Sequence, residues 1–177
     1  MKDRHVALIR GINVGRAKRV SMADLRVLMA GLGLRECRTL LNSGNIVFSA
    51  GAGRSTGIGP RIERAMLAQL GVAARVIVLA AHEFSTVVEG NRLPRTADDP
   101  SRVLIAFVGK AADLGLLSAL QKRNWSPEVL SLGTRAAYLW CPAGVGKSPL
   151  VAAVGGVLGE GTTTRNWATV KKLQALL

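Results

Sequence analysis

The fold is decided by residues 5–48, HVALIRGINVGRAKRVSMADLRVLMAGLGLRECRTLLNSGNIVF. The stretch opens with an apolar run, His5 to Ile9, which is typical of a short buried strand. Ser21 and Asp24 then have the spacing of a helix capping box, and the leucines and methionines behind them repeat every three or four residues. The stretch therefore predicts a strand followed, after a basic connection, by an amphipathic helix.

The end of the same stretch predicts a β-hairpin. Residues 39–41 and 46–48 are β-prone, and Asn42-Ser43-Gly44-Asn45 between them has the composition of a turn. A second amphipathic helix over 58–70 and a strand over 74–79 follow. The predicted order is β-α-β-β-α-β, which is the ferredoxin-like order.

The pattern then restarts after a short helix over 82–89 and a Pro- and Asp-containing linker over 91–101. The second series of predicted elements comprises a strand over 103–108, a helix over 111–122, paired strands over 128–132 and 136–140, a helix over 149–158, a strand over 162–164 and a helix over 166–177. The predicted fold class is α+β, with two ferredoxin-like (βαββαβ-type) halves in tandem, closed by a C-terminal helix. The predicted domains are 1–95 and 96–177.

Composition favours a soluble protein with an affinity for anions. The net charge is +13, and both ends of the chain are basic while the middle is nearly neutral. A basic field attracts polyanions, although genomic bias and solubility explain the same charge. No signal peptide or membrane-spanning run is visible, so we expect a cytoplasmic protein. Cys37 and Cys141 lack zinc-ligand spacing and are expected to be buried thiols.

Catalytic chemistry finds little support in the residues. Gly146-Lys147-Ser148 is similar to the end of a P-loop, but the glycine that this motif requires five residues before Gly146 is replaced by Cys141. Ser148 instead predicts a helix cap with Pro149 in the first turn. Neither a Ser-His-Asp order nor a HExxH helix is present. We therefore predict no catalytic residue, no metal site and no cofactor, while the question of enzyme or non-enzyme stays open.

Three segments combine glycines, amides and cations. The connection after the first strand suits a phosphate or nucleic-acid backbone, because glycine lets a ligand approach and helix N-termini attract anions. A solvated connection, with Asn13 making turn hydrogen bonds, is the alternative. The turn at 42–45 is expected to be structural, with ligand contact as the alternative. The predicted ligand-binding residues are Arg10, Asn13, Lys18, Arg19, Ser43, Asn45, Arg165 and Asn166.

The same segments make the chain resemble the bacterial domain of unknown function 1697 family. The resemblance is carried by Ala7 to Gly15, Met22 to Leu25, Ser43 to Phe48 and Thr164 to Leu173. It implies two ferredoxin-like halves and implies no activity, cofactor or catalytic residue. The chain departs from the family pattern at Arg16, where a second glycine usually follows Val-Gly, and at Leu41-Asn42, where Ile-Gln is usual.

Three functions remain open at this stage. The preferred one is a module that binds anions or a nucleic-acid backbone through the basic loop 10–19 and the helix start 165–172. The alternative is an enzyme or binding protein for a small anionic metabolite or nucleotide, which requires the two ends of the chain to form one pocket. A purely structural or protein-interacting unit is the third. The sequence decides neither the ligand nor the oligomeric state.

Overall fold

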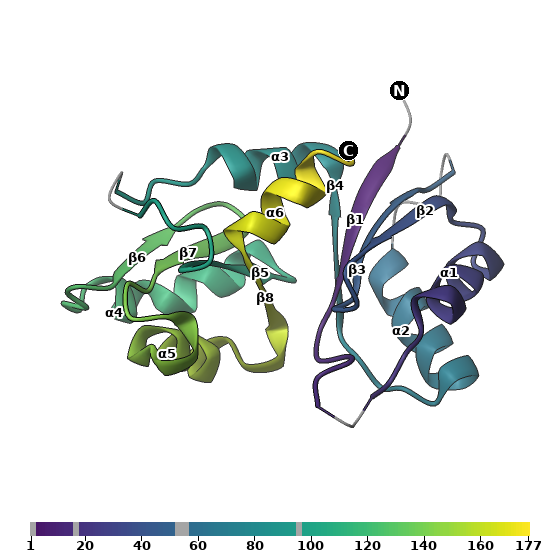
Figure 1. The fold of residues 1–177 in the computed structure, drawn as a ribbon, viewed down its shortest axis with the longest axis horizontal. Helices are drawn as coiled ribbons and strands as arrows, with labels where there is room; N and C mark the ends of the chain where they lie inside the picture. The colour runs from purple at the N-terminus through teal and green to yellow at the C-terminus, as the bar shows by residue number, and fades with distance from the viewer. Residues whose placement is uncertain (1–2, 16–17, 52–56, 95–96) are drawn as a thin grey trace. The chain divides into compact units, whose positions relative to one another are not determined.

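The computed structural model describes residues 3–15, 18–51, 57–94 and 97–177 (Figure 1). The chain forms two compact units. The N-terminal unit comprises Met1–Phe84 with Leu176–Leu177, and the C-terminal unit comprises Ser85–Ala175. The helix α3 (Ala81–Glu89) crosses from one unit to the other. Each unit contains one four-stranded antiparallel sheet.

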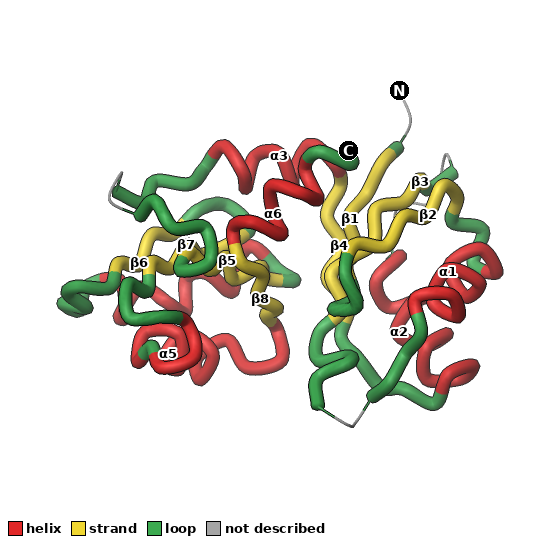
Figure 2. Tube along the Cα trace, viewed as in Figure 1, coloured by secondary structure: helices red, strands yellow, loops and turns green. Residues whose placement is uncertain are grey.

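The N-terminal unit has the strand order β2-β3-β1-β4. Its strands and helices are β1 (Arg4–Ile9), α1 (Met22–Gly31), β2 (Arg35–Leu40), β3 (Asn45–Ser49), α2 (Ile58–Leu70) and β4 (Val76–Ala80). Both helices cover the same face of the sheet (Figure 2). Ala7, Ile9 and Phe48 on that face are buried together with Leu25 of α1 and Ile62 of α2. Burial of these apolar side chains is the main force that holds the helices on the sheet.

The C-terminal unit repeats the strand order as β6-β7-β5-β8. Its elements are β5 (Val103–Val108), a 3₁₀ helix η1 (Ala111–Leu117), α4 (Ser118–Gln121), β6 (Val129–Leu132), β7 (Ala136–Trp140), the short 3₁₀ helices η2 (Val145–Lys147) and η3 (Gly159–Gly161), α5 (Pro149–Leu158), β8 (Thr162–Asn166) and α6 (Trp167–Gln174). Ala106 and Leu139 on the sheet share one core cluster with Leu117 and Val154. The Tyr138 hydroxyl is buried and donates to the Val87 carbonyl of α3 at 2.7 Å.

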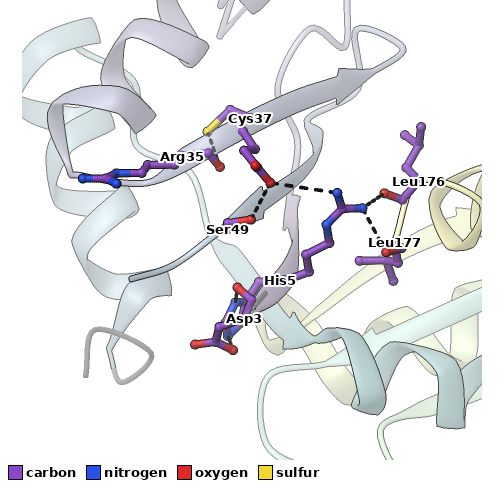
Figure 3. Close-up of polar contacts among 9 residues, drawn as sticks. Asp3, His5, Arg35, Cys37, Ser49, Leu176 and Leu177 are labelled. Atoms are coloured by element: carbon purple, nitrogen blue, oxygen red, sulfur yellow. Dashed lines mark hydrogen bonds and ion pairs between the residues drawn. The ribbon is translucent and has the colours of Figure 1, made fainter. Parts of the chain in front are cut away.

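Arg4 attaches the last two residues of the chain to the N-terminal unit (Figure 3). Its Nη1 donates to the main-chain oxygens of Leu176 and Leu177, at 2.8 and 2.9 Å. Its Nη2 lies 3.9 Å from Glu36 Oε2, which also accepts a hydrogen bond from Ser49 Oγ at 3.0 Å. Arg4 thus links β1 to β2 and to the end of the chain, and Glu36 extends this network to Ser49 of β3.

The α+β class is confirmed, and most predicted elements occur close to their expected positions. Three expectations were wrong in detail. The helix predicted over 111–122 is a 3₁₀ helix over its first seven residues, although Leu114, Leu117 and Leu120 are buried as expected. The strand predicted over 39–41 begins at Arg35 and ends before Leu41, which has a φ of 58° and belongs to the turn. The last helix ends at Gln174 instead of Leu177.

Among the described helices, none is both long enough and apolar enough to cross a membrane. The cytoplasmic location stays a prediction, as do the domain limits 1–95 and 96–177, which differ from the division into compact units at residues 84 and 85.

Candidate anion-binding site

Asn13 closes the connection between β1 and α1 upon itself. Its side-chain Oδ1 accepts from the Val20 N–H at 2.9 Å, and its Nδ2 donates to the Val20 carbonyl at 2.8 Å and to the Asn42 carbonyl at 2.7 Å. The backbone of Asn13 has a φ of 56°, which asparagine tolerates better than most residues. These bonds join the connection to the β2–β3 turn, so Asn13 acts as a positioning residue.

The turn of the β2–β3 hairpin packs closely against the end of β1. The Ile9 N–H donates to the Gly44 carbonyl at 2.8 Å. A Cβ atom on Gly44 would lie 2.7 Å from Ile9 Cβ and 3.0 Å from Ile12 Cδ1, and the φ of Gly44 is 75°. Only glycine meets both requirements without strain. The turn and the β1–α1 connection therefore form one rigid surface.

A hollow of about 550 Å³ lies on this surface and is called the Arg19 hollow below. It is bounded by the closed connection, by the start of α1 and by the hairpin turn. Its lining residues are Asn13, Arg19, Val20, Ser21, Met22 and Asn42. Its volume falls within the range of roughly 300–1,000 Å³ that is usual for small-molecule sites.

Arg19 in the lining, its chain neighbour Lys18 outside the lining, and a helix N-terminus give this hollow a positive character. Lys18 and Arg19 are exposed, and neither forms an ion pair with any residue that the structure describes. The α1 helix begins beside them, with the Ser21 hydroxyl accepting from the Asp24 N–H at 2.9 Å. Unpaired N–H groups and the helix dipole favour anions there. The exposed Asp24 carboxylate in the first turn partly offsets this field.

The other predicted residues of the N-terminal unit have different surroundings. Arg10 is half-buried, and its main-chain N–H donates to the Arg75 carbonyl at 2.8 Å. Asn45 is fully buried, and its Nδ2 donates to the Leu40 carbonyl and to Ser43 Oγ. Asn45 therefore fixes the turn from inside. Arg10, Ser43 and Asn45 are outside the lining of the Arg19 hollow, whereas Asn13 and Arg19 are part of it.

Arg165 and Asn166 belong to the C-terminal unit, at the junction of β8 and α6. Asn166 Oδ1 accepts from the Thr169 N–H at 2.9 Å, so this side chain caps α6 as predicted. Arg165 Nη1 donates to Thr163 Oγ1 and to the Thr164 carbonyl. Burial lowers the pKa of the Arg165 guanidinium to about 10, because desolvation penalises its charge. A half-buried cation thus lies beside the positive end of a helix.

His5 and the two cysteines have structural surroundings. His5 is buried and stacks on Phe48 at a centroid distance of 5.5 Å. Burial raises the pKa of the Cys37 and Cys141 thiols, which makes both of them poor nucleophiles at neutral pH. Across the described part of the chain, no three His, Cys, Asp or Glu side chains are grouped in a way that could hold a metal ion.

Comparison with known proteins gives a family without an assigned function. Residues 1–138 match the model of the family described as protein of unknown function (DUF1697). The chain belongs to the DUF1697 family. The block 164–173 lies beyond the matched region. No curated protein matches the chain.

A solved structure supports the fold alone. The structure of conserved bacterial protein SP0830 from Streptococcus pneumoniae is similar to this chain, with a TM-score of 0.81 and 24% sequence identity. The similarity covers 99% of this chain and 99% of that chain.

Sequence reasoning missed several lining residues of the Arg19 hollow. Ser21 and Met22 are predicted only as parts of a helix, and Asn42 belongs to a turn for which ligand contact is only the alternative. The Asn13 side chain donates to the Asn42 carbonyl, and this bond holds the turn beside the β1–α1 connection. A hydrogen bond between residues so far apart in the chain has no local signal in the sequence. Arg16, the remaining cation of this connection, lies outside the described residues.

Proposed function

We propose that this DUF1697 protein binds anionic ligands, and the phosphate backbone of nucleic acid in particular, through the Arg19 hollow. The observation that carries the proposal is the exposed cation Arg19, which lines a hollow of about 550 Å³ just ahead of the N-terminus of α1. A second exposed cation, Lys18, is its neighbour in the chain. Phosphate contacts of this kind come from Lys, Arg and helix N-termini. The net charge of +13 adds a long-range attraction for polyanions.

The strand orders support a ferredoxin-like interpretation of both units, with β1 and β5 at the same place in their sheets. Fold alone is a weak argument for function, since such sheets serve many purposes. The proposal therefore depends on the cations. Arg165, beside the start of α6, is proposed as a further anion contact in the C-terminal unit.

The test is fluorescence anisotropy of labelled single-stranded RNA and duplex DNA over a range of salt concentrations. Arg19→Gln is compared with Arg64→Gln, which removes the same charge from an exposed position on α2. We expect Arg19→Gln to lower the slope of log K against log salt by about 1 and to weaken binding to all sequences equally. If both variants lower the slope and the affinity equally, the Arg19 hollow is not a binding site, and binding comes from the net positive charge of the protein alone.

A small anionic metabolite or nucleotide is the second candidate, favoured by the size of the Arg19 hollow. Such a ligand would raise the melting temperature, whereas a backbone-binding surface would respond weakly to single phosphates. A thermal-shift screen of nucleotides and sugar phosphates separates the two functions. A shift that Arg19→Gln removes and Arg64→Gln preserves would favour the small molecule.

A further inference from the structure

A second hollow, of about 340 Å³, lies in the C-terminal unit between α4 and β6. It follows the connection 122–128, and it is called the Trp125 hollow below. Its lining combines an aromatic ring, a cation, amides and a carboxylate, from Gln121, Arg123, Asn124, Trp125, Ser126, Pro127, Glu128, Val129 and Leu130. This mixture differs from that of the Arg19 hollow, where none of the described lining residues is acidic or aromatic.

The aromatic part of the Trp125 hollow is fixed in place. The Trp125 indole Nε1 donates to the Leu120 carbonyl at 2.7 Å, which holds the ring against the end of α4. The Arg123 guanidinium lies over the ring, 4.6 Å from its centroid. Within the described part of the chain, no acid or carbonyl bonds this guanidinium. Its planar face and its N–H edge are therefore available to a ligand.

A carboxylate at the other side of the hollow has an unused acceptor. Glu128 is 9% exposed, and its Oε2 accepts from the Leu150 N–H at 3.1 Å, at the start of α5. Its Oε1 has no hydrogen-bond partner among the described residues. This oxygen is not among the buried atoms that lack a partner, so solvent reaches it, and a ligand in the hollow can bond to it through an N–H group.

The charges around the hollow limit the chemistry of that ligand. Glu128 repels a simple phosphate or carboxylate that enters the hollow, and Arg123 in the lining repels an amine. A neutral planar group with N–H donors satisfies Glu128 and stacks beside Arg123, and an attached phosphate reaches its guanidinium. A nucleotide has all of these parts.

We propose that the Trp125 hollow binds one nucleobase of a nucleotide or single strand, with guanine preferred because its Watson–Crick edge presents adjacent N–H donors to Glu128. The volume of about 340 Å³ suits one base with its sugar and no more. This site deepens the nucleic-acid function proposed above and adds base recognition to it, but its geometry is independent of the Arg19 hollow.

The test uses mononucleotides first, so that backbone binding does not contribute. The indole N–H signal of Trp125, assigned with Trp125→Phe, is followed by NMR during titration with GMP, IMP and UMP. We expect GMP to shift this signal and to bind about tenfold more tightly than IMP, which lacks the exocyclic amine. Glu128→Gln keeps an acceptor for the Leu150 N–H and replaces the free acceptor with an NH₂ group. This variant should lose the preference, while Arg64→Gln should retain it.

Several results would overturn the base site: equal affinity for GMP and UMP, a preference that persists in Glu128→Gln, or no change at Trp125 with millimolar GMP. Binding of a heptauridylate, a short single strand without guanine, then reports on the phosphate-backbone site at the Arg19 hollow separately from the base site. If the wild-type protein prefers GMP but Arg19→Gln binds heptauridylate normally, the Trp125 site stands and the Arg19 site fails. If the wild-type protein shows no preference for GMP and Arg19→Gln binds heptauridylate more weakly, the Arg19 site stands and the Trp125 site fails.

Discussion

The two units share one strand order but place their extra chain at different points. In the N-terminal unit, β1 reaches α1 through a long connection, residues 10–21, whereas in the C-terminal unit β5 reaches η1 through Gly109 and Lys110 alone. The next connections show the opposite. Residues 32–34 join α1 to β2, and residues 122–128 join α4 to β6. Each long connection lines a hollow.

The difference teaches which residues the fold does not require. A sheet with this strand order forms with a short first connection in one unit and a short second connection in the other. The length of 10–21 and of 122–128 is therefore free to serve another purpose, and loops on a rigid scaffold are where binding residues concentrate. The following substitutions test whether the two long connections are binding surfaces or merely solvated turns.

The largest effect is expected at Gly44, which couples the hairpin turn to the β1–α1 connection. Gly44→Ala adds a Cβ atom against Ile9 and Ile12 at a φ of 75°, so backbone strain and overpacking together should cost about 2–5 kcal/mol of unfolding free energy. Gly71→Ala is the control, because Gly71 has a φ of 64° with nothing within 4 Å of its added Cβ. Urea unfolding measures both. Equal losses would show that the close approach at Gly44 has no energetic weight.

Asn13→Ala should have the next largest effect, because it removes all three side-chain hydrogen bonds that close the connection. At about 1 kcal/mol for each bond, the loss is about 2–3 kcal/mol, and anion binding at the Arg19 hollow should disappear with it. Asn42→Ala is the matched control. Its side chain lines the same hollow, but only its main-chain carbonyl accepts from Asn13. Stability should therefore change by less than about 0.5 kcal/mol in that variant.

The C-terminal unit has its own test at Tyr138, which lies outside both long connections. Tyr138→Phe leaves the Val87 carbonyl without its donor and should cost about 1–2 kcal/mol at neutral pH. Burial raises the pKa of Tyr138 from 10.0 to about 12. Because the unfolded chain loses this proton first, stability should be complete below pH 10 and fall as the pH rises toward 12. Denaturant midpoints across this range should decrease in the wild type relative to the variant.

The sequence predicted the elements well where the pattern was regular. The helices over 58–70 and 149–158 occur at the expected residues, because apolar side chains recur in them every four residues. The strand over 103–108 also occurs where expected, because it is an unbroken apolar run. The region 111–117 has well-spaced leucines and nevertheless forms a 3₁₀ helix. Leucine spacing identifies the buried face, but it does not distinguish two helix types that bury the same face.

The candidate sites were harder to predict, because they depend on contacts between distant residues. The cations Lys18 and Arg19 and the positioning residue Asn13 were visible in the sequence. The hollow itself depends on the bond from Asn13 to Asn42, and the Trp125 hollow depends on Glu128 reaching the Leu150 N–H. Neither pairing has a periodic or local signature.

The smallest stability effect is expected at Arg165, and it sharpens the proposed contact beside α6. Burial lowers the pKa of this group to about 10, so its charge opposes folding at neutral pH, and this cost fades only as the pH rises above 10. Arg165→Met removes that cost together with the bonds to Thr163 and Thr164. The two changes oppose one another, and the net change should stay below about 1 kcal/mol.

Binding should respond differently from stability in the same variant. If Arg165 contacts an anion, Arg165→Met weakens RNA binding in the anisotropy assay at near-physiological salt, and Arg165→Lys, which keeps the charge, retains part of it. Thermal unfolding of both variants shows that the fold is intact. A marked loss of stability without a loss of binding would make Arg165 a structural residue of β8. The anion contacts would then belong to the long connection of the N-terminal unit alone. The N-terminal unit would bind the phosphate backbone, and the C-terminal unit would recognise a base.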